Sequence, residues 1–173
     1  MTDNLLISRE DIAKYKQISN SAEKGRIIDQ YILEAQIQDI ASLVGEKIYN
    51  ELLFEPEKHE LLLDGGEYIH EGRKFNCYGL KVVLIHFAWA RYVRFGSYVD
   101  TPYSMVQKRV NESEPVSTRE KDSIYTNSRD TAIEYYRNVE RYMIRAGLIK
   151  ASCCGQPNKP IKSKYTSIKT YRR

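Results

Sequence analysis

The sequence predicts a mainly helical domain that carries one small β-hairpin and ends in an extended basic arm. Apolar residues recur at spacings of three and four in several segments, which is typical of helices that bury one face. Residues 79–95 are apolar around most of their helical circumference and predict a helix with neighbours on several sides. Residues 151–173 combine basic side chains with Gly and Pro. We therefore expect a bundle of about four to five helices over 1–150 and an arm over 151–173.

Residues 79–95 are the most apolar part of the chain, and we expect the other elements to pack around this core helix. It is too short and too interrupted by Lys and Arg to span a bilayer, which needs roughly 20 mostly apolar residues, so no membrane is expected. Its main apolar arc contains Val82, Leu84, Ile85, Ala88, Trp89, Tyr92, Val93 and Phe95. Leu80, Val83 and Phe87 fall on the other side, among His86, Arg91 and Arg94.

Charge is distributed unevenly along the 173 residues. The net charge is +4, but residues 151–173 hold six basic residues and no acid. The body, 1–150, is left with 21 basic and 23 acidic residues, a net charge of −2. The body is therefore not a nucleic-acid surface by charge, whereas the arm suits nucleic acid or an acidic protein partner. Fourteen tyrosines fit either interfaces or the boundary of a small core.

Helix signals dominate the first 60 residues. Ser8 with Asp11 predicts a helix start, and the helix from Arg9 to about Gln17 should bury Ile12 and Tyr15. Asn20-x-x-Glu23 opens a long amphipathic helix that Gly45 ends, and a short helix over 46–53 is stopped by Pro56. The inward residues expected in the long helix are Ile27, Ile28, Tyr31, Ile32, Ala35, Ile37, Ile40, Ala41 and Val44.

The next residues predict β-structure. We interpret Leu61-Leu62-Leu63 as the start of this β region, which leads into a turn at 64–66. Residues 68–70 and 74–77 should then form a hairpin, with Gly72 at a positive φ. Residues 96–117 read as a long loop with an extended stretch from Met105 to Val110, which favours a functional segment or one folded back on its own domain. Ser117-x-x-Glu120 starts a last long helix, which Gly147 ends.

No catalytic or metal-binding pattern is present. His59, His70 and His86 have no partner at a metal-ligand spacing, and phosphate-binding loops and nucleophile elbows are absent from the sequence. The three cysteines, Cys77 and the pair Cys153-Cys154, argue against a disulfide framework. The N-terminus has no signal-peptide pattern, which favours synthesis in a reducing cytosol. We expect no enzyme, no cofactor and no metal.

The arm offers two kinds of contact. Tyr165 and Tyr171 alternate with lysines and arginine, a pattern suited to single-stranded nucleic acid. The same stretch suits a strand added to the edge of a partner's sheet. One side of that strand would carry Ser163, Tyr165, Ser167 and Lys169. The other would carry Lys164, Thr166, Ile168 and Thr170, and this β-branched content favours the strand. A plain solubilising tail is the remaining alternative.

The order of these signals resembles a known family. Ala35-Gln36 is followed by Leu43-Val44-Gly45-Glu46-Lys47-Ile48-Tyr49, then Gly65-Gly66-x-Tyr68, then Gly79-Leu80-Lys81 opening an aromatic-rich helix. Over residues 5–148 this is similar to the head-to-tail adaptor, connector or neck-ring, proteins of tailed bacteriophages, especially those of crAss-like phages. The resemblance lies in order and spacing. Cys153-Cys154 has no place in the family pattern.

The resemblance implies a structural virion protein in the neck between capsid and tail, made in the host bacterial cytoplasm. Such proteins form a homo-oligomeric ring, commonly of twelve copies, that joins the portal protein to another neck or tail protein. The ring extends a channel for double-stranded DNA, and a mildly acidic body suits passage without specific binding. The arm would contact the portal or a neighbouring subunit through Lys159, Lys162, Lys164, Tyr165, Lys169 and Tyr171.

In such a ring, the subunit interface would use two parts of the chain. Residues 96–117 would supply Tyr98, Tyr103 and Met105 for subunit or channel contacts. The second apolar side of the core helix, Leu80, Val83 and Phe87, would be buried between chains rather than within one. A different class of function stays open at this point: a small nucleic-acid-binding module that acts through its basic tail.

Overall fold

The mainly helical class with a small β-hairpin is confirmed. The structure, a computed structural model, describes residues 4–18, 22–96, 98–100, 105–107 and 116–150. The helices are α1 (Arg9–Ala13), α2 (Ala22–Ala35), the π-helical η1 (Gln36–Ile40), α3 (Ala41–Val44), α4 (Glu46–Phe54), the 3-10 helix η2 (Pro56–His59), α5 (Glu60–Asp64), α6 (Leu80–Phe95) and α7 (Thr118–Arg145). The strands are β1 (Gly66–His70), β2 (Arg73–Cys77), β3 (Tyr98–Asp100) and β4 (Met105–Gln107).

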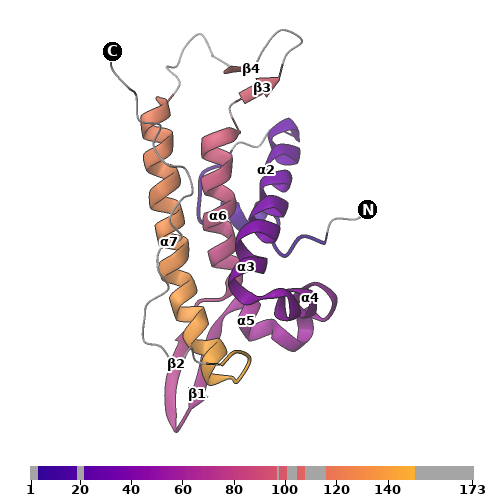
Figure 1. Ribbon diagram of the computed structural model, residues 1–173, viewed down its shortest axis with the longest axis vertical. Coiled ribbons are helices and arrows are strands. Elements are labelled where there is room, and N and C mark those ends of the chain that lie inside the picture. Colours follow the sequence, from indigo (N-terminus) through magenta and orange to yellow (C-terminus); the bar gives the residue numbers. More distant parts are fainter. Residues whose placement is uncertain (1–3, 19–21, 97, 101–104, 108–115, 151–173) are drawn as a thin grey trace, which may run out of the picture.

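Three long helices run along the molecule, with α6 between α2 and α7 (Figure 1). The β1–β2 hairpin lies at the end where α7 finishes and α6 begins. The β3–β4 pair lies at the opposite end, above the last turn of α6. α4, η2 and α5 form a short helical side branch close to the hairpin end.

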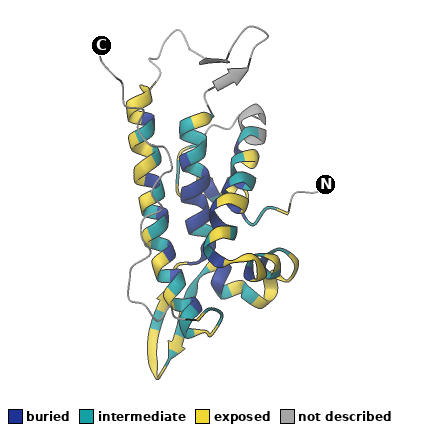
Figure 2. Cartoon of the chain, viewed as in Figure 1, coloured by how far each residue is buried: buried dark blue, intermediate teal, exposed yellow. Residues whose placement is uncertain are grey.

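α6 is the centre of the core. Leu80, Val83, Leu84, Ile85, Phe87, Ala88 and Ala90 are all at most 2% exposed. Burial is concentrated along this helix and on the faces of α2 and α7 that meet it (Figure 2). The low charge and broad apolar surface of residues 79–95 therefore reflect burial on several sides.

Local capping sets the ends of several helices. Ser8 and Ser117 each form a capping box: the serine Oγ accepts the N–H of Asp11 or Glu120, and that residue's carboxylate accepts the serine N–H. After α7, Gly147 N–H donates to Ile144 O at 3.1 Å and Leu148 N–H donates to Met143 O at 2.9 Å. This is a Schellman motif, with Gly147 at φ +72°.

The hairpin is closed by a two-residue turn, and its base is closed by two glycines. Glu71 and Gly72 have φ of +49° and +75°, so the positive φ predicted for Gly72 is confirmed. At the base, a Cβ on Gly65 would stand 2.6 Å from Cys77 O, and one on Gly79 would stand 2.5 Å from Leu63 O. The segment that leads from α5 into β1 and the segment that leads from β2 into α6 therefore cross with their backbones in contact.

Three local predictions are wrong. The stretch Leu61–Leu63 is helical, in α5, because its apolar residues pack as one helical turn against the core rather than alternating. Tyr15 is 53% exposed because α1 ends at Ala13, before the turn that would bury it. Ile37 is 54% exposed because the π-helical η1 turns Gln36 and Asp39, rather than Ile37, toward the protein interior.

A second antiparallel pair, β3–β4, lies within the stretch predicted to be a loop with an extended segment. Val99 pairs with Val106, and Tyr98 with Gln107. The extended backbone expected from Met105 onward is confirmed for β4. The remainder of the predicted stretch Met105–Val110 lies outside the described residues.

Candidate functional site

A buried carboxylate joins three helical elements. Asp39, on η1, has a side chain that is 8% exposed. Its Oδ2 accepts hydrogen bonds from Arg91 Nε at 3.1 Å and Nη2 at 2.8 Å, and its Oδ1 accepts one from Arg129 Nη1 at 3.0 Å. Arg91 comes from α6 and Arg129 from α7. We call Asp39, Arg91 and Arg129 the Asp39 clamp.

Aromatic rings and a second carboxylate extend the Asp39 clamp along the α6–α7 seam. The guanidinium of Arg129 lies 5.0 Å from the centre of the Phe87 ring. Arg94 lies 4.6 Å from the Tyr125 ring centre, and its Nε is 3.1 Å from Asp122 Oδ1. Each of these guanidinium groups already faces a carboxylate and a ring, an arrangement that stiffens a joint between helices.

The π-helical η1 also anchors the N-terminal segment. Gln36 is 1% exposed. Its Oε1 accepts the N–H of Leu6 at 2.9 Å, and its Nε2 donates to Asn4 O at 2.9 Å and to Tyr49 Oη at 3.3 Å. The side-chain amide of Gln36 therefore forms hydrogen bonds both with the backbone of the extended N-terminal segment and with a side chain of α4.

The hairpin is attached to the C-terminal end of α7 by an aromatic cluster. Tyr68 packs on Phe75 at 5.7 Å and edge-on to Tyr142 at 4.9 Å between ring centres. Arg145 lies 3.8 Å from the Phe75 ring centre and donates to Tyr68 Oη at 2.8 Å. The opposite face of the hairpin carries Ile69, which is 73% exposed.

The three histidines lie in separate places. His59 Nε2 is 2.9 Å from Glu51 Oε2, and His70 is on the hairpin. His86 is buried on α6, where it stacks on Tyr135 at 5.4 Å between ring centres, and its Nδ1 has no hydrogen-bond partner among the described residues. Within those residues no group of three His, Cys, Asp or Glu side chains is placed to hold a metal ion.

Stability should fall in mildly acidic solution because of His86. Burial, aided by the positive charge of Lys16, lowers the pKa of His86 from 6.5 to about 4. Between these values the unfolded chain binds a proton that the folded chain does not, so the free energy of unfolding decreases as the pH falls. The expected loss between pH 7 and 5 is about 2 kcal/mol.

Urea unfolding at pH 7, 6 and 5 measures this loss. The variant His86→Phe should flatten the profile, and His70→Gln serves as the control for removing a histidine from the surface of the hairpin. An equally steep profile in His86→Phe would show that other groups cause the loss.

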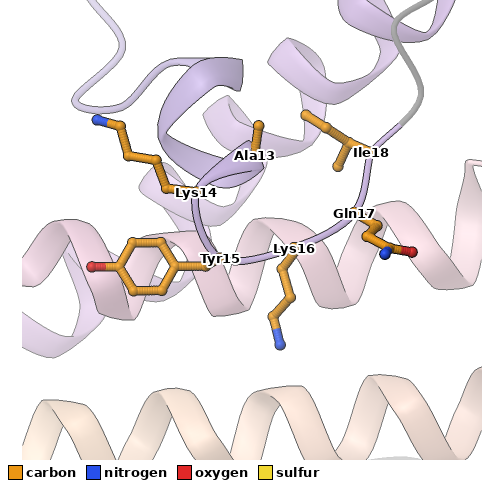
Figure 3. A pocket seen from close by; sticks show the side chains of 6 residues that line it. All are labelled: Ala13, Lys14, Tyr15, Lys16, Gln17 and Ile18. Carbon is orange, nitrogen blue, oxygen red and sulfur yellow. The ribbon is translucent and has the colours of Figure 1, made fainter.

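A shallow hollow of about 540 Å³ lies where α1 leads toward α2. It is lined by Ala13, Lys14, Tyr15, Lys16, Gln17 and Ile18 (Figure 3). Lys14 is already paired with Asp11 at 2.8 Å, and the lining contains no carboxylate, histidine, serine or cysteine. The charged and aromatic side chains gathered at the Asp39 clamp and at the hairpin make the surfaces around them the better functional candidates.

Three of the predicted interface residues require a correction. Leu80, Val83 and Phe87 are 1%, 0% and 1% exposed within the single chain. The expectation that they remain uncovered until a second subunit arrives is wrong, because α7 and the neighbouring elements already enclose α6 on that side. Phe87 instead supports Arg129 of the Asp39 clamp.

The other predicted contact residues fall largely beyond what the structure describes. Tyr98 is the first residue of β3 and pairs with Gln107, and Met105 is the first residue of β4 and pairs with Asp100. The two therefore lie at opposite ends of this antiparallel pair, of which only the backbone is described. Tyr103 and the pair Cys153-Cys154 lie outside the described residues. So do all the residues predicted for the arm contact: Lys159, Lys162, Lys164, Tyr165, Lys169 and Tyr171.

Comparison with known proteins gives one family. Residues 40–159 match DUF6712, a family of unknown function. The match covers more than half of the chain. The chain belongs to the DUF6712 family. No curated protein and no solved structure matches it.

The DUF6712 match includes the hairpin, α6, α7 and the first part of the predicted arm. It begins one residue after Asp39, so Arg91 and Arg129 of the clamp are inside it. Within the parts of the chain that the structure describes, no helix is both long and apolar enough to cross a membrane.

The Asp39 clamp was missed by sequence reasoning, although one signal pointed to it. Ile28, Ile32 and Ala35 form a buried row at spacings of four and three, and Asp39 is the next position of that row. A carboxylate on an apolar helical stripe needs a buried partner. Which arginines would supply it depends on the packing of α6 and α7, which no local pattern contains.

Proposed function

We propose that this DUF6712 chain is a structural subunit of a ring in the neck of a tailed bacteriophage, joining the portal to the tail and extending the DNA channel. The observation that carries the proposal is the order of elements over residues 5–148. A long helix, a short helix, a Gly-Gly turn into a hairpin, a Gly-initiated core helix and a last long helix follow one another as in the adaptor proteins that the sequence resembles.

Exposed apolar side chains at both ends of the α6–α7 pair add support. Phe95 and Ile124, at one end, are 42% and 38% exposed. At the other end, Ile69 on the hairpin is 73% exposed. Large exposed apolar residues favour protein contacts, and a ring needs two different surfaces on each subunit, one for each neighbour.

Co-assembly with a portal protein tests this function. The full chain, mixed with the portal protein of the same phage, should yield rings or portal-bound complexes in mass photometry and negative-stain images. A chain ending at residue 150 should keep its helical circular dichroism and lose stable docking, because the arm supplies the contact.

Other outcomes of this experiment are equally informative. A chain that stays monomeric with the portal, yet binds oligonucleotides with a steep salt dependence, would replace the ring proposal with the nucleic-acid-binding module. Normal docking by the shortened chain would remove the arm from the proposal while leaving the ring. Loss of helical signal in the shortened chain would place the domain boundary beyond residue 150.

A further inference from the structure

The β1–β2 hairpin has two outer edges, and its register shows which backbone groups face outward. The two-residue turn makes His70–Arg73 a hydrogen-bonded pair, and hydrogen-bonded and non-hydrogen-bonded pairs alternate from there. Ile69 pairs with Lys74, and Glu67 pairs with Asn76, at the non-hydrogen-bonded positions. The N–H and C=O groups of these four residues therefore point away from the partner strand.

The outer edge of β2 is occupied at the base of the hairpin, where α7 lies beside it. The side-chain amide of Asn138, on α7, donates to Asn76 O at 3.1 Å and accepts the N–H of Tyr78 at 3.0 Å. Asn138 thus takes the place that a neighbouring strand would have. On β1, the outward backbone groups of Glu67 and Ile69 have no partner among the described residues. Among the described residues, β1 is therefore the edge that no other element covers, and we call it the free edge of the sheet.

The side chains along this free edge suit a basic, apolar-faced strand. Ile69 stands 73% exposed on the face that points away from α7. Glu67 and Glu71, whose side chains are 76% and 87% exposed, have only distant partners among the described residues, Lys74 Nζ at 3.8 Å and His70 Nε2 at 3.9 Å. A free edge with an exposed β-branched residue is a template for another strand, and a hairpin of two strands gains stability from a third.

We propose that residues 162–170 of this chain add as a third strand along the free edge of β1. The segment has no acid, and its alternation places Lys164, Thr166, Ile168 and Thr170 on one face. With Ile168 opposite Ile69, that face would cover exposed apolar surface. Lys164 would then stand diagonally across from Glu67 in a parallel pairing, or from Glu71 in an antiparallel pairing, within reach of the carboxylate in either case.

The chain is long enough for this docking. α7 ends at the hairpin, where Arg145 contacts Tyr68 and Phe75 (Figure 1). The eleven residues 151–161 span at most about 36 Å when extended, which reaches the hairpin of the same chain or of an adjacent copy. The docking does not depend on the ring proposed above. The strand adds to the same edge of β1 whether it comes from the same chain or from an adjacent copy.

Backbone amide hydrogen exchange on the full chain, measured by NMR, tests the proposal. The amides of Glu67 and Ile69 should exchange at least about tenfold more slowly than expected for unbonded amides, because they donate to the added strand. In the double variant Thr166→Pro and Ile168→Pro, which removes two donors and the extended pairing, this protection should be lost. The amides of Tyr68 and His70, which face β2, should be unchanged.

The matched control is the double variant Thr166→Ala and Ile168→Ala, which keeps both backbone N–H groups and should retain most of the protection. Rapid exchange of Glu67 and Ile69 in the unaltered chain would overturn the proposal. So would protection that survives the proline substitutions, since another group would then cover the edge. Protection that falls on dilution assigns the strand to another copy, and protection independent of concentration assigns it to the same chain; both support the docking.

Discussion

Replacing Gly79 with alanine should destabilise the fold by on the order of 3 kcal/mol or more. Gly79 has φ +83° and ψ 152°, a conformation that essentially only glycine adopts without strain. A Cβ there would also lie 2.5 Å from Leu63 O and 2.7 Å from Gly65 N, both of them backbone atoms that cannot turn aside. Relief would require the base of the hairpin to open, which separates α5 from the start of α6.

The chain contains a matched control for this effect. Gly45 has nearly the same backbone angles, φ +85° and ψ 153°, and also precedes a helix, but a Cβ on it would meet nothing within 4 Å. Gly45→Ala therefore measures backbone strain alone, and the difference between the two variants measures the close contact. Urea unfolding of both provides the comparison, and equal losses would show that the crossing at Gly79 has no steric role.

Replacing Asp39 with alanine should cost about 3–5 kcal/mol, because the buried guanidinium of Arg91 loses its hydrogen-bonded carboxylate and keeps only the partly exposed Glu34 at 4.0 Å. The Arg91 side chain is 11% exposed and directs two hydrogen bonds to Asp39. The α6–α7 seam would then hold uncompensated positive charge. Chemical denaturation measures the loss, and α6 and α7 should show the largest increase in amide exchange.

Two further variants distinguish the Asp39 clamp from ordinary surface charge. Glu34→Ala removes a carboxylate that lies 4.0 Å from Arg91 and is 37% exposed, and it should cost at most about 1 kcal/mol. Replacing the pair together, as Asp39→Leu with Arg91→Met, should recover much of the stability lost in Asp39→Ala. If the paired replacement is as unstable as Asp39→Ala, burial of unpaired charge is not the cause.

The helix boundaries could be predicted where their causes are local. Ser8 and Ser117 form their caps with residues three positions away, and Gly45 and Gly147 end helices through their own φ angles. Gly72 likewise belongs to a turn that closes within four residues. Such signals are complete in a short stretch of sequence, so the fold class and most element ends follow from them.

The Asp39 clamp and the burial of α6 could not be predicted in the same way. Asp39 is 52 positions from Arg91 and 90 positions from Arg129, and their pairing exists only after three helices have packed. The helical periodicity of residues 79–95 placed Leu80, Val83 and Phe87 on the same side as the arginines. It could not show that α7 covers that side. Leu61–Leu63 was ambiguous because a short apolar run fits a strand and a helical turn equally.

The length of α7 has a mechanical consequence. Its 28 residues extend for about 42 Å, from the capping box of Ser117 to the aromatic cluster of the hairpin. α6 supports it along this length, and the Asp39 clamp ties both helices to the continuation of α2. A force applied to the hairpin along this axis would therefore compress α7 along its length. A supported helix resists such compression, so α7 holds the hairpin end and the Ser117 end of the molecule apart.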